Sequence, residues 1–319
     1  MRPSHTSIWF ALVKARLSLL VLLTAAVGFA VAPRPAGSAF PWQLFLWTCL
    51  GTGLAAASAA MLNQLWEVRR DAQMKRTAHR PLPAGHTRPI TVFIVGVALA
   101  YGSFALLAGM VNMLAAGLAL ANILVYVLLY TPLKPLTTLN TLVGAVTGAV
   151  PPLIGWAGAV GHLDGGAWAL FFILFVWQLP HFMALAWMYR EDYARGGFVM
   201  LPSRDAEGNA TAQVCVLTSL LLVPAGLMAT LTGVAGYSYA VTAVVLGLGM
   251  SVLAWRFVMQ RTHNRARHLF LASLLYLPLL LGMMVIDGGS VVPVGRESGK
   301  GKLIELPVSF GELNGRSVE

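Results

Sequence analysis

Long apolar runs recur along the whole chain, and they restrict it to the folds that a lipid bilayer accepts. A membrane-spanning helix needs about 20 consecutive, mostly apolar residues. Runs of roughly that length cover residues 17–32, 43–62, 90–110, 113–131, 138–160, 167–189, 212–234, 236–256 and 268–286. Only 11% of the 319 residues are charged, whereas a soluble domain carries about 25%. The sequence therefore predicts an all-α, polytopic membrane protein with about nine transmembrane helices.

Basic residues are distributed unevenly between the two sides of such a protein. With nine spans and the N-terminus inside, most of the 22 Lys and Arg residues fall on one side, including Lys14 and Arg16, which flank the first run. Because basic loops stay on the cytoplasmic side, we expect the N-terminus and the long loops in the cytoplasm and the C-terminus on the opposite side. The formal charge of +10 then reflects topology and contact with anionic membrane lipid, which argues against nucleic acid as a partner.

The polar segments between the runs indicate a single membrane domain. Residues 1–286 contain all the predicted spans, and residues 287–319 form a polar tail that we expect to be poorly ordered. The longest predicted loops, residues 63–89 and 190–211, lie on the same side of the membrane. Charged groups so close to hydrocarbon are costly to place, so these two loops are the first candidates for a functional site.

Three oxygen-bearing side chains follow the second run at intervals of four residues. Asn63, Glu67 and Asp71, here called the acidic stripe, fall on one face of a helix at this spacing. Mg²⁺ takes one or two carboxylates together with water and phosphate oxygens, and the nearby Arg76 and Arg80 suit phosphate because their planar forks bind two oxygens. The stripe therefore predicts a magnesium-bound diphosphate. The alternative is an ordinary charged helix end with local ion pairs.

The middle of the chain adds a second polar feature and a helix break. Tyr130 and Lys134 follow the fourth run on the same predicted side. They are either membrane-interface anchors or, facing the stripe, a hydroxyl and an ammonium for diphosphate oxygens. Pro151 and Pro152 interrupt the fifth run. We expect them to break or kink that helix, which a membrane protein tolerates where the broken helix lines a cavity.

A second acidic cluster follows the sixth run. Asp192 offers a carboxylate for a second metal or for proton transfer, and Arg190 is either a phosphate ligand or an interface anchor. His181 lies about three turns earlier, within the apolar run, where a histidine is either structural or a ligand. These two clusters lie four spans apart, each where a span enters a long basic loop, so we expect them on the same side of the membrane.

These motifs resemble one known family. The acidic stripe, continued to residue 85, resembles the first aspartate-rich motif of intramembrane prenyltransferases of the UbiA type, with Glu67 where the family usually has Asp. Tyr130 and Lys134 are similar to that family's loop motif. Three further stretches, residues 80–83, 140–156 and 177–202, resemble the members that prenylate haem. The resemblance covers roughly residues 10–286.

The resemblance implies a fold and a reaction. The helices would surround a central cavity, capped by the two long loops. Mg²⁺ would be the cofactor, farnesyl diphosphate the donor and haem B the acceptor, with His181 as an iron ligand or a haem-orienting group. The implied catalytic residues are Glu67, Asp71, Lys134 and Asp192, the implied metal ligands Asn63, Glu67, Asp71 and Asp192, and the implied substrate-binding residues Asn63, Arg76, Arg80, Tyr130, His181 and Arg190.

The resemblance also implies a setting. The expected location is a bacterial plasma membrane, and a haem A synthase or a terminal oxidase assembly factor would be a partner. Two other functions remain open from the sequence. A sister prenyltransferase would act on an aromatic ring or a quinone precursor and would share the acidic stripe. A transporter would also have broken helices and charges near the midplane, but it would release no diphosphate and would need no magnesium.

Overall fold

The computed structural model describes residues 4–35 and 37–288, and these residues form helices joined by turns and loops. The elements are α1 (His5–Leu12), α2 (Ala15–Val31), α3 (Trp42–Asp71), α4 (Pro89–Met110), α5 (Met113–Leu124), the π-helix η1 (Val125–Tyr130), α6 (Thr131–Leu133), α7 (Asn140–Ala149), α8 (Pro151–Val160), α9 (Gly165–Met188), α10 (Arg190–Arg195), α11 (Leu201–Arg204), α12 (Asn209–Leu231), α13 (Tyr237–Met259) and α14 (His263–Asp287). The predicted tail lies outside the described residues from residue 289 onward.

The prediction of about nine spans is confirmed for the described residues. Eight helical segments are long and apolar enough to cross a membrane, and α1 and α2, bent by 50° at a short break, can form a ninth. Large apolar side chains stay exposed on these helices, as Leu46, Phe93 and Val252 do. Such exposure would be costly in water and is expected of surfaces that face lipid. The chain is an integral membrane protein.

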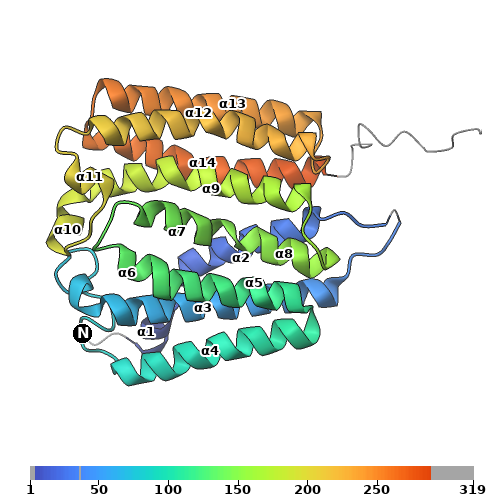
Figure 1. Cartoon of the computed structure of the whole chain (residues 1–319), viewed down its shortest axis with the longest axis horizontal. Coiled ribbons are helices and arrows are strands. Elements are labelled where there is room, and N and C mark those ends of the chain that lie inside the picture. Colours follow the sequence, from blue (N-terminus) through green and yellow to red (C-terminus); the bar gives the residue numbers. More distant parts are fainter. Residues whose placement is uncertain (1–3, 36, 289–319) are drawn as a thin grey trace, which may run out of the picture.

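The spans run side by side in one bundle (Figure 1). In that view α9, α12, α13 and α14 make up one side, α3, α4 and α5 the other, and α2, α7 and α8 lie between them. The most extensive helix pairings are α3 with α4, α12 with α13, α9 with α12, and α2 with α8. The largest apolar core among the described residues lies mainly among α9, α12, α13 and α14 and extends to α2, α7 and α8. This core packs the helices on one side of the bundle against each other.

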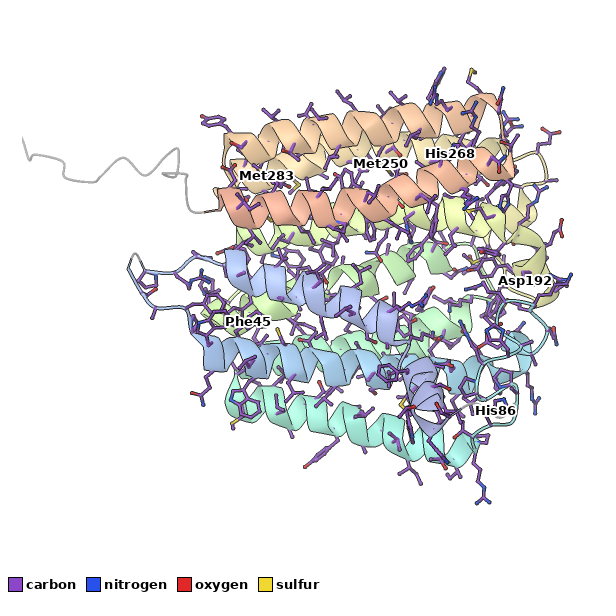
Figure 2. The ribbon with its side chains drawn as sticks, turned by 180° about the vertical axis from the view of Figure 1, so that it is seen from behind. Phe45, His86, Asp192, Met250, His268 and Met283 are labelled. Atoms are coloured by element: carbon purple, nitrogen blue, oxygen red, sulfur yellow. The ribbon has the colours of Figure 1, made fainter. Side chains whose placement is uncertain are left out.

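The two long loops meet at one end of the bundle. The segment between α3 and α4 and the segment with α10 and α11 lie side by side there (Figure 1). Figure 2 shows His86 and Asp192, one from each segment, at this end, with Phe45 and Met283 at the other. The predicted polar cap is therefore present. The loop predicted at residues 63–89 is shorter than expected, because α3 continues through Asp71 and carries the acidic stripe within the helix.

Two helix irregularities shape the interior. The predicted break occurs at Val150, between α7 and α8, where Pro151 begins the second half of the span. There α8 lies so close to α2 that a Cβ on Gly155 would overlap the Ala25 carbonyl oxygen. The second irregularity is η1, a wide helical turn of a kind often found at functional sites. It leads into α6, which ends just before Lys134, and its last residue, Tyr130, lines the central cavity.

Candidate active site

The acidic stripe occupies the last turns of α3 and faces the interior of the bundle. The expectation that they share one helix face is confirmed, and the structure adds that this face is buried, with Asn63, Glu67 and Asp71 0%, 4% and 1% exposed. Buried carboxylates are costly unless they are paired or hydrogen-bonded. Their partners therefore show how the site is built.

Both carboxylates of the stripe are paired with cations from other segments. Lys134 Nζ lies 2.8 Å from Glu67 Oε1, and Arg80 Nη1 lies 2.7 Å from Asp71 Oδ2. Among the salt bridges of the described residues, none joins these carboxylates to a basic residue of α3. The alternative of local ion pairs at a helix end is therefore not what the chain forms. Instead, the pairs tie α3 to the start of the α6–α7 loop and to the cap.

Asn63 is held by the N-terminal segment and by α6. Lys14 Nζ donates to Asn63 Oδ1 at 2.7 Å, and Asn63 Nδ2 donates to Thr131 Oγ1 at 3.0 Å. These two contacts fix which way the amide points, because the oxygen must accept and the nitrogen must donate. The amide oxygen of Asn63 consequently points toward Lys14. Asn63 itself lies on the same face of α3 as the two carboxylates.

The donor set of the stripe fits Mg²⁺. Asp71 Oδ1 is buried and has no hydrogen-bond partner, so one carboxylate oxygen is left without a proton donor. No group of three or more His, Cys, Asp and Glu side chains that could hold a metal occurs among residues 4–35 and 37–288. The stripe offers two carboxylates and one amide oxygen, which matches an ion that completes its shell with water and phosphate oxygens.

Asp192 lies in the cap and binds the backbone of the other long loop. Its oxygens accept from the N–H groups of Lys75 at 2.8 Å and Arg76 at 3.1 Å, and from Arg195 Nη2 at 2.6 Å. Burial alone would raise the pKa of the Asp192 carboxyl, but these donors outweigh it and lower the pKa. The carboxylate thus fastens residues 75–76 over the site. Its predicted roles as metal ligand and catalytic group stay predictions.

A cavity of about 430 Å³ opens beside the stripe, with a charged end and apolar walls. The charged end is formed by Lys14, Glu67, Asp71, Arg76, Arg80 and Lys134. The walls are largely apolar and include Leu17, Val21, Ala55, Ile123, Ile154 and Phe182. A cavity built in this way suits an amphiphilic ligand that has an anionic head and a hydrocarbon tail. The helices thus surround a central cavity, as the family resemblance implied.

Aromatic rings surround the cations at the charged end. Lys134 Nζ lies 4.5 Å from the ring centroid of Tyr130. Arg76 lies between the rings of Tyr189 and Tyr193, at 5.4 Å and 5.6 Å from their centroids. Cation–π contacts of this kind hold a charge in place without neutralising it. The structure therefore brings Tyr130, Lys134, Arg76 and Arg80 together around the stripe.

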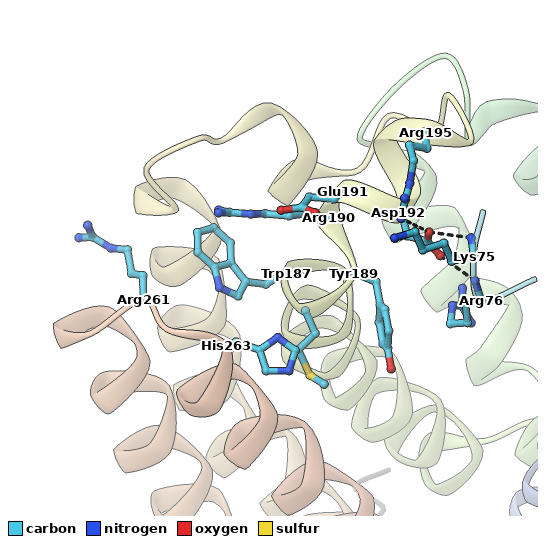
Figure 3. Close-up of a pocket in the computed structure, with 11 residues that line it drawn as sticks. Lys75, Arg76, Trp187, Tyr189, Arg190, Glu191, Asp192, Arg195, Arg261 and His263 are labelled. Atoms are coloured by element: carbon cyan, nitrogen blue, oxygen red, sulfur yellow. Dashed lines mark hydrogen bonds and ion pairs between the residues drawn. The ribbon is translucent and has the colours of Figure 1, made fainter. Parts of the chain in front are cut away.

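Arg190 lies elsewhere, in a second pocket of about 690 Å³ in the cap (Figure 3). Its guanidinium stacks over the ring of Trp187 at 4.4 Å and donates to the carbonyl oxygen of Ala206. Arg76 lines both this pocket and the central cavity, whereas Arg190 lines only the second pocket. The predicted role of Arg190 in substrate binding stays a prediction. If Arg190 binds substrate, it does so in the second pocket and not beside the stripe.

His181 lines the central cavity from α9, and its contacts fix its proton. Its Nδ1 lies 2.8 Å from Ser273 Oγ, and that hydroxyl donates its one proton to the carbonyl oxygen of Phe270 at 2.6 Å. Nδ1 must therefore carry a proton and donate it to Ser273, which leaves Nε2 with a lone pair. The imidazole is stacked on Trp177 at 5.1 Å between ring centroids.

Sequence reasoning missed Lys14 as a site residue. It was assigned to the basic flank of the first span, yet its ammonium reaches Asn63 on α3. No spacing in the sequence links two residues so far apart along the chain. The nearest signal is the position of Lys14 just before an apolar run, which is shared by many anchoring lysines.

Comparison with known proteins agrees with this geometry. The model of the UbiA prenyltransferase family matches residues 21–277. A protein from Salinibacter ruber named protoheme IX farnesyltransferase is similar to the chain, with 44% identity over 279 residues, 88% of this chain and 98% of that protein.

Solved structures share the fold. A digeranylgeranylglyceryl phosphate synthase aligns with a TM-score of 0.74 at 12% identity, covering 90% of this chain and 99% of that chain. A UbiA homologue from Archaeoglobus fulgidus bound to DMAPP and Mg²⁺ aligns with a TM-score of 0.58 at 15% identity, covering 87% and 99%. At these identities the likeness establishes the fold alone.

Proposed function

Because the chain belongs to the UbiA prenyltransferase family, we propose that it transfers the farnesyl group of farnesyl diphosphate to a vinyl group of haem B. Water adds in the same reaction, and the products are haem O and diphosphate. The observation that supports the donor half is the cavity whose charged end contains the two carboxylates of the acidic stripe, Glu67 and Asp71, and whose walls are largely apolar. The acceptor rests on the 44% identity to a protoheme IX farnesyltransferase.

The charged end would bind the diphosphate head of the donor. Asn63, Glu67 and Asp71 are the proposed ligands of Mg²⁺, which when bound would offset charge on the diphosphate and polarise its oxygens. Lys134, Arg76 and Arg80 would donate to the remaining oxygens. Their ammonium and guanidinium groups face the place where negative charge grows as the allylic C–O bond breaks, so they stabilise the leaving diphosphate more than the bound substrate.

The apolar walls would hold the farnesyl chain and keep water away from the allylic cation. Leu17, Val21 and Ile154 offer no group that could add to it. In the transfer step the terminal vinyl carbon supplies the electron pair for the new C–C bond, and the C–O electrons leave with the diphosphate. The cation left beside the porphyrin ring then takes a hydroxyl from water, which loses a proton. A dry cavity delays that water until after the C–C bond has formed.

His181 is the proposed contact to the acceptor. Its Nε2 lone pair lies on an imidazole that lines the cavity, and a ligating histidine ordinarily donates its other ring N–H to a fixed partner. Here that partner is Ser273. Neutral imidazole is a common axial ligand of haem iron. His181 would then fix the porphyrin while its vinyl edge meets the donor.

The setting of the protein follows from the same proposal. The cap would face the cytoplasm of a bacterial cell, in line with the basic residues gathered there. A haem A synthase or a terminal oxidase assembly factor would receive the product. Such acceptors are expected because a farnesylated haem is too apolar to cross water unaided.

Product analysis tests the proposal. Purified protein is incubated with haem B, farnesyl diphosphate and Mg²⁺, and the pigments are separated and weighed by mass spectrometry. We expect a haem whose mass has increased by one farnesyl group and one hydroxyl, and we expect its loss in Glu67→Gln and Asp71→Asn. Arg69→Gln, an exposed position on α3, is the matched control and should keep the activity. A prenylated aromatic acid instead of a haem would favour the sister enzyme, and no diphosphate release with any acceptor would favour a transporter.

A further inference from the structure

Lys14 has an unusual backbone conformation. Its φ and ψ are 47° and 53°. Among the described residues, no other residue apart from glycines has a positive φ. It lies at the 50° bend between α1 and α2. A residue with a Cβ is strained in this left-handed region, and such strain persists where the surrounding structure enforces it, often at functional sites. A glycine would adopt this conformation without strain, so the presence of a lysine at this position needs an explanation.

Helix α3 enforces the bend. Gln64 Nε2 donates to the carbonyl oxygens of Leu12 at 2.6 Å and Ala11 at 3.3 Å, which lie at the end of α1. The neighbouring residue, Asn63, accepts from Lys14 Nζ at 2.7 Å. Two consecutive residues of α3 therefore fix both the backbone at the bend and the ammonium group. The result is a lysine that is aimed into the charged end of the cavity rather than toward lipid headgroups.

The charge of Lys14 has no carboxylate partner. Lys134 and Arg80 form salt bridges with Glu67 and Asp71, whereas Lys14 takes part in none of the salt bridges between described residues. Its partner is the neutral amide oxygen of Asn63. A partly buried cation that faces a cavity and donates only to a neutral oxygen is well placed to bind an anion, since a charged acceptor forms a shorter and stronger hydrogen bond than an amide does.

The same contact also blocks a proposed metal ligand. While Lys14 donates to Asn63 Oδ1, an ammonium lies where a cation would otherwise approach that oxygen. The ion and the lysine therefore compete for the amide until an anion arrives to take the lysine away. Anion binding and metal binding at the stripe are thereby linked through one side chain.

We propose that Lys14 is a diphosphate ligand that exchanges partners when substrate binds. Its ammonium leaves Asn63 Oδ1 for a diphosphate oxygen, and the amide oxygen becomes open to the metal ion. Lys14 thus delays metal binding until the diphosphate is present. This inference rests on the donor half of the proposed function and is independent of the acceptor.

The test measures two ligands separately, with no haem and no farnesyl group. Binding of Mn²⁺ alone is followed by electron paramagnetic resonance, and binding of inorganic pyrophosphate in excess Mg²⁺ by titration calorimetry, on protein in phosphatidylcholine nanodiscs. In Lys14→Met we expect pyrophosphate affinity to fall by about 10- to 100-fold, the scale of a hydrogen bond to a charged group. We expect Mn²⁺ affinity to rise by roughly two- to fivefold, because a competing like charge is removed. A lysine with a merely structural role would move both affinities the same way.

Three variants keep the test decisive. Arg16→Met removes an exposed basic residue two positions away and should change neither affinity. Lys14→Arg keeps the charge and should retain most of the pyrophosphate binding. Lys14→Gly suits the positive φ, so it should fold at least as well as the natural chain and show the same opposite changes as Lys14→Met. If Lys14→Gly binds both probes as the natural chain does, the inference is wrong. If the natural chain binds neither probe, the donor half of the proposed function fails instead.

Discussion

Replacing Glu67 by Gln will destabilise the protein before any substrate is present, because it leaves the Lys134 ammonium without its counter-charge. The two groups are 2.8 Å apart, and their side chains are 5% and 16% exposed. Removing one partner of a fully buried ion pair costs about 3–5 kcal/mol. Here the cost should be smaller, about 2 kcal/mol, because Gln keeps an oxygen acceptor and a hydrogen bond to a charged group contributes about 1.5–3 kcal/mol. Lys134→Met should cost a similar amount, since it leaves the Glu67 carboxylate buried without its counter-charge.

A double-mutant cycle isolates the pair from the other effects of each substitution. Thermal unfolding in nanodiscs, followed by tryptophan fluorescence, is compared for the natural chain, Glu67→Gln, Lys134→Met and the double variant. We expect each single change to lower Tm by several degrees. The double variant should lose much less Tm than the two single losses added together, which corresponds to a coupling energy of about 1.5 kcal/mol. Arg69→Gln serves as the exposed control. Additive shifts, with a coupling energy near zero, would refute the view that the stripe is built on this pair.

Three further outcomes are expected. Gly155→Ala should lower Tm strongly or prevent folding, because its Cβ would overlap the Ala25 carbonyl oxygen, whereas Gly117→Ala, which meets open space, should leave thermal unfolding nearly unchanged. The lowered pKa of Asp192 means that its bonds stabilise the cap fully above the unfolded pKa of about 3.9 and are lost as the pH falls through the lower folded value. Asp192→Asn should therefore flatten the acid limb of a plot of Tm against pH, and an unchanged limb would remove its role in holding the loop. Chelation of divalent ions should lower pyrophosphate affinity without lowering Tm in the ligand-free protein, and equal affinity with and without chelator would contradict a metal-bridged head group.

The spans and the acidic stripe could be predicted because they depend on local rules. Lipid accepts only long apolar runs, and a spacing of four places side chains on one helix face. The double proline at residues 151–152 broke its span as expected, because a ring nitrogen cannot donate within the helix. The end of α3 was harder to place, since the apolar signal stops at residue 62 while the helix continues to Asp71.

The partners of the stripe could not be predicted in this way. Lys134 was expected to face the first cluster as a diphosphate ligand, but its salt bridge with Glu67 depends on how the π-helix turns the end of its span. The contact of Lys14 depends on a bend that Gln64 enforces from another helix. The hydrogen bonds of Asp192 to backbone N–H groups of the other loop had no signal in the sequence either, and its predicted role as a metal ligand stays a prediction. Each of these contacts is set by tertiary packing, for which a single sequence carries no periodic signal.

A structure of the protein with Mn²⁺ and a non-reacting farnesyl thiodiphosphate would locate the ion directly from its anomalous scattering. We expect the ion about 2.1 Å from an oxygen of Asp71, with Asn63 Oδ1 and diphosphate oxygens in its shell and the hydrocarbon chain along the apolar walls. An ion bound only in the second pocket beside Asp192, or a diphosphate held by basic residues with no ion at the stripe, would contradict the proposal that α3 activates the donor through a metal.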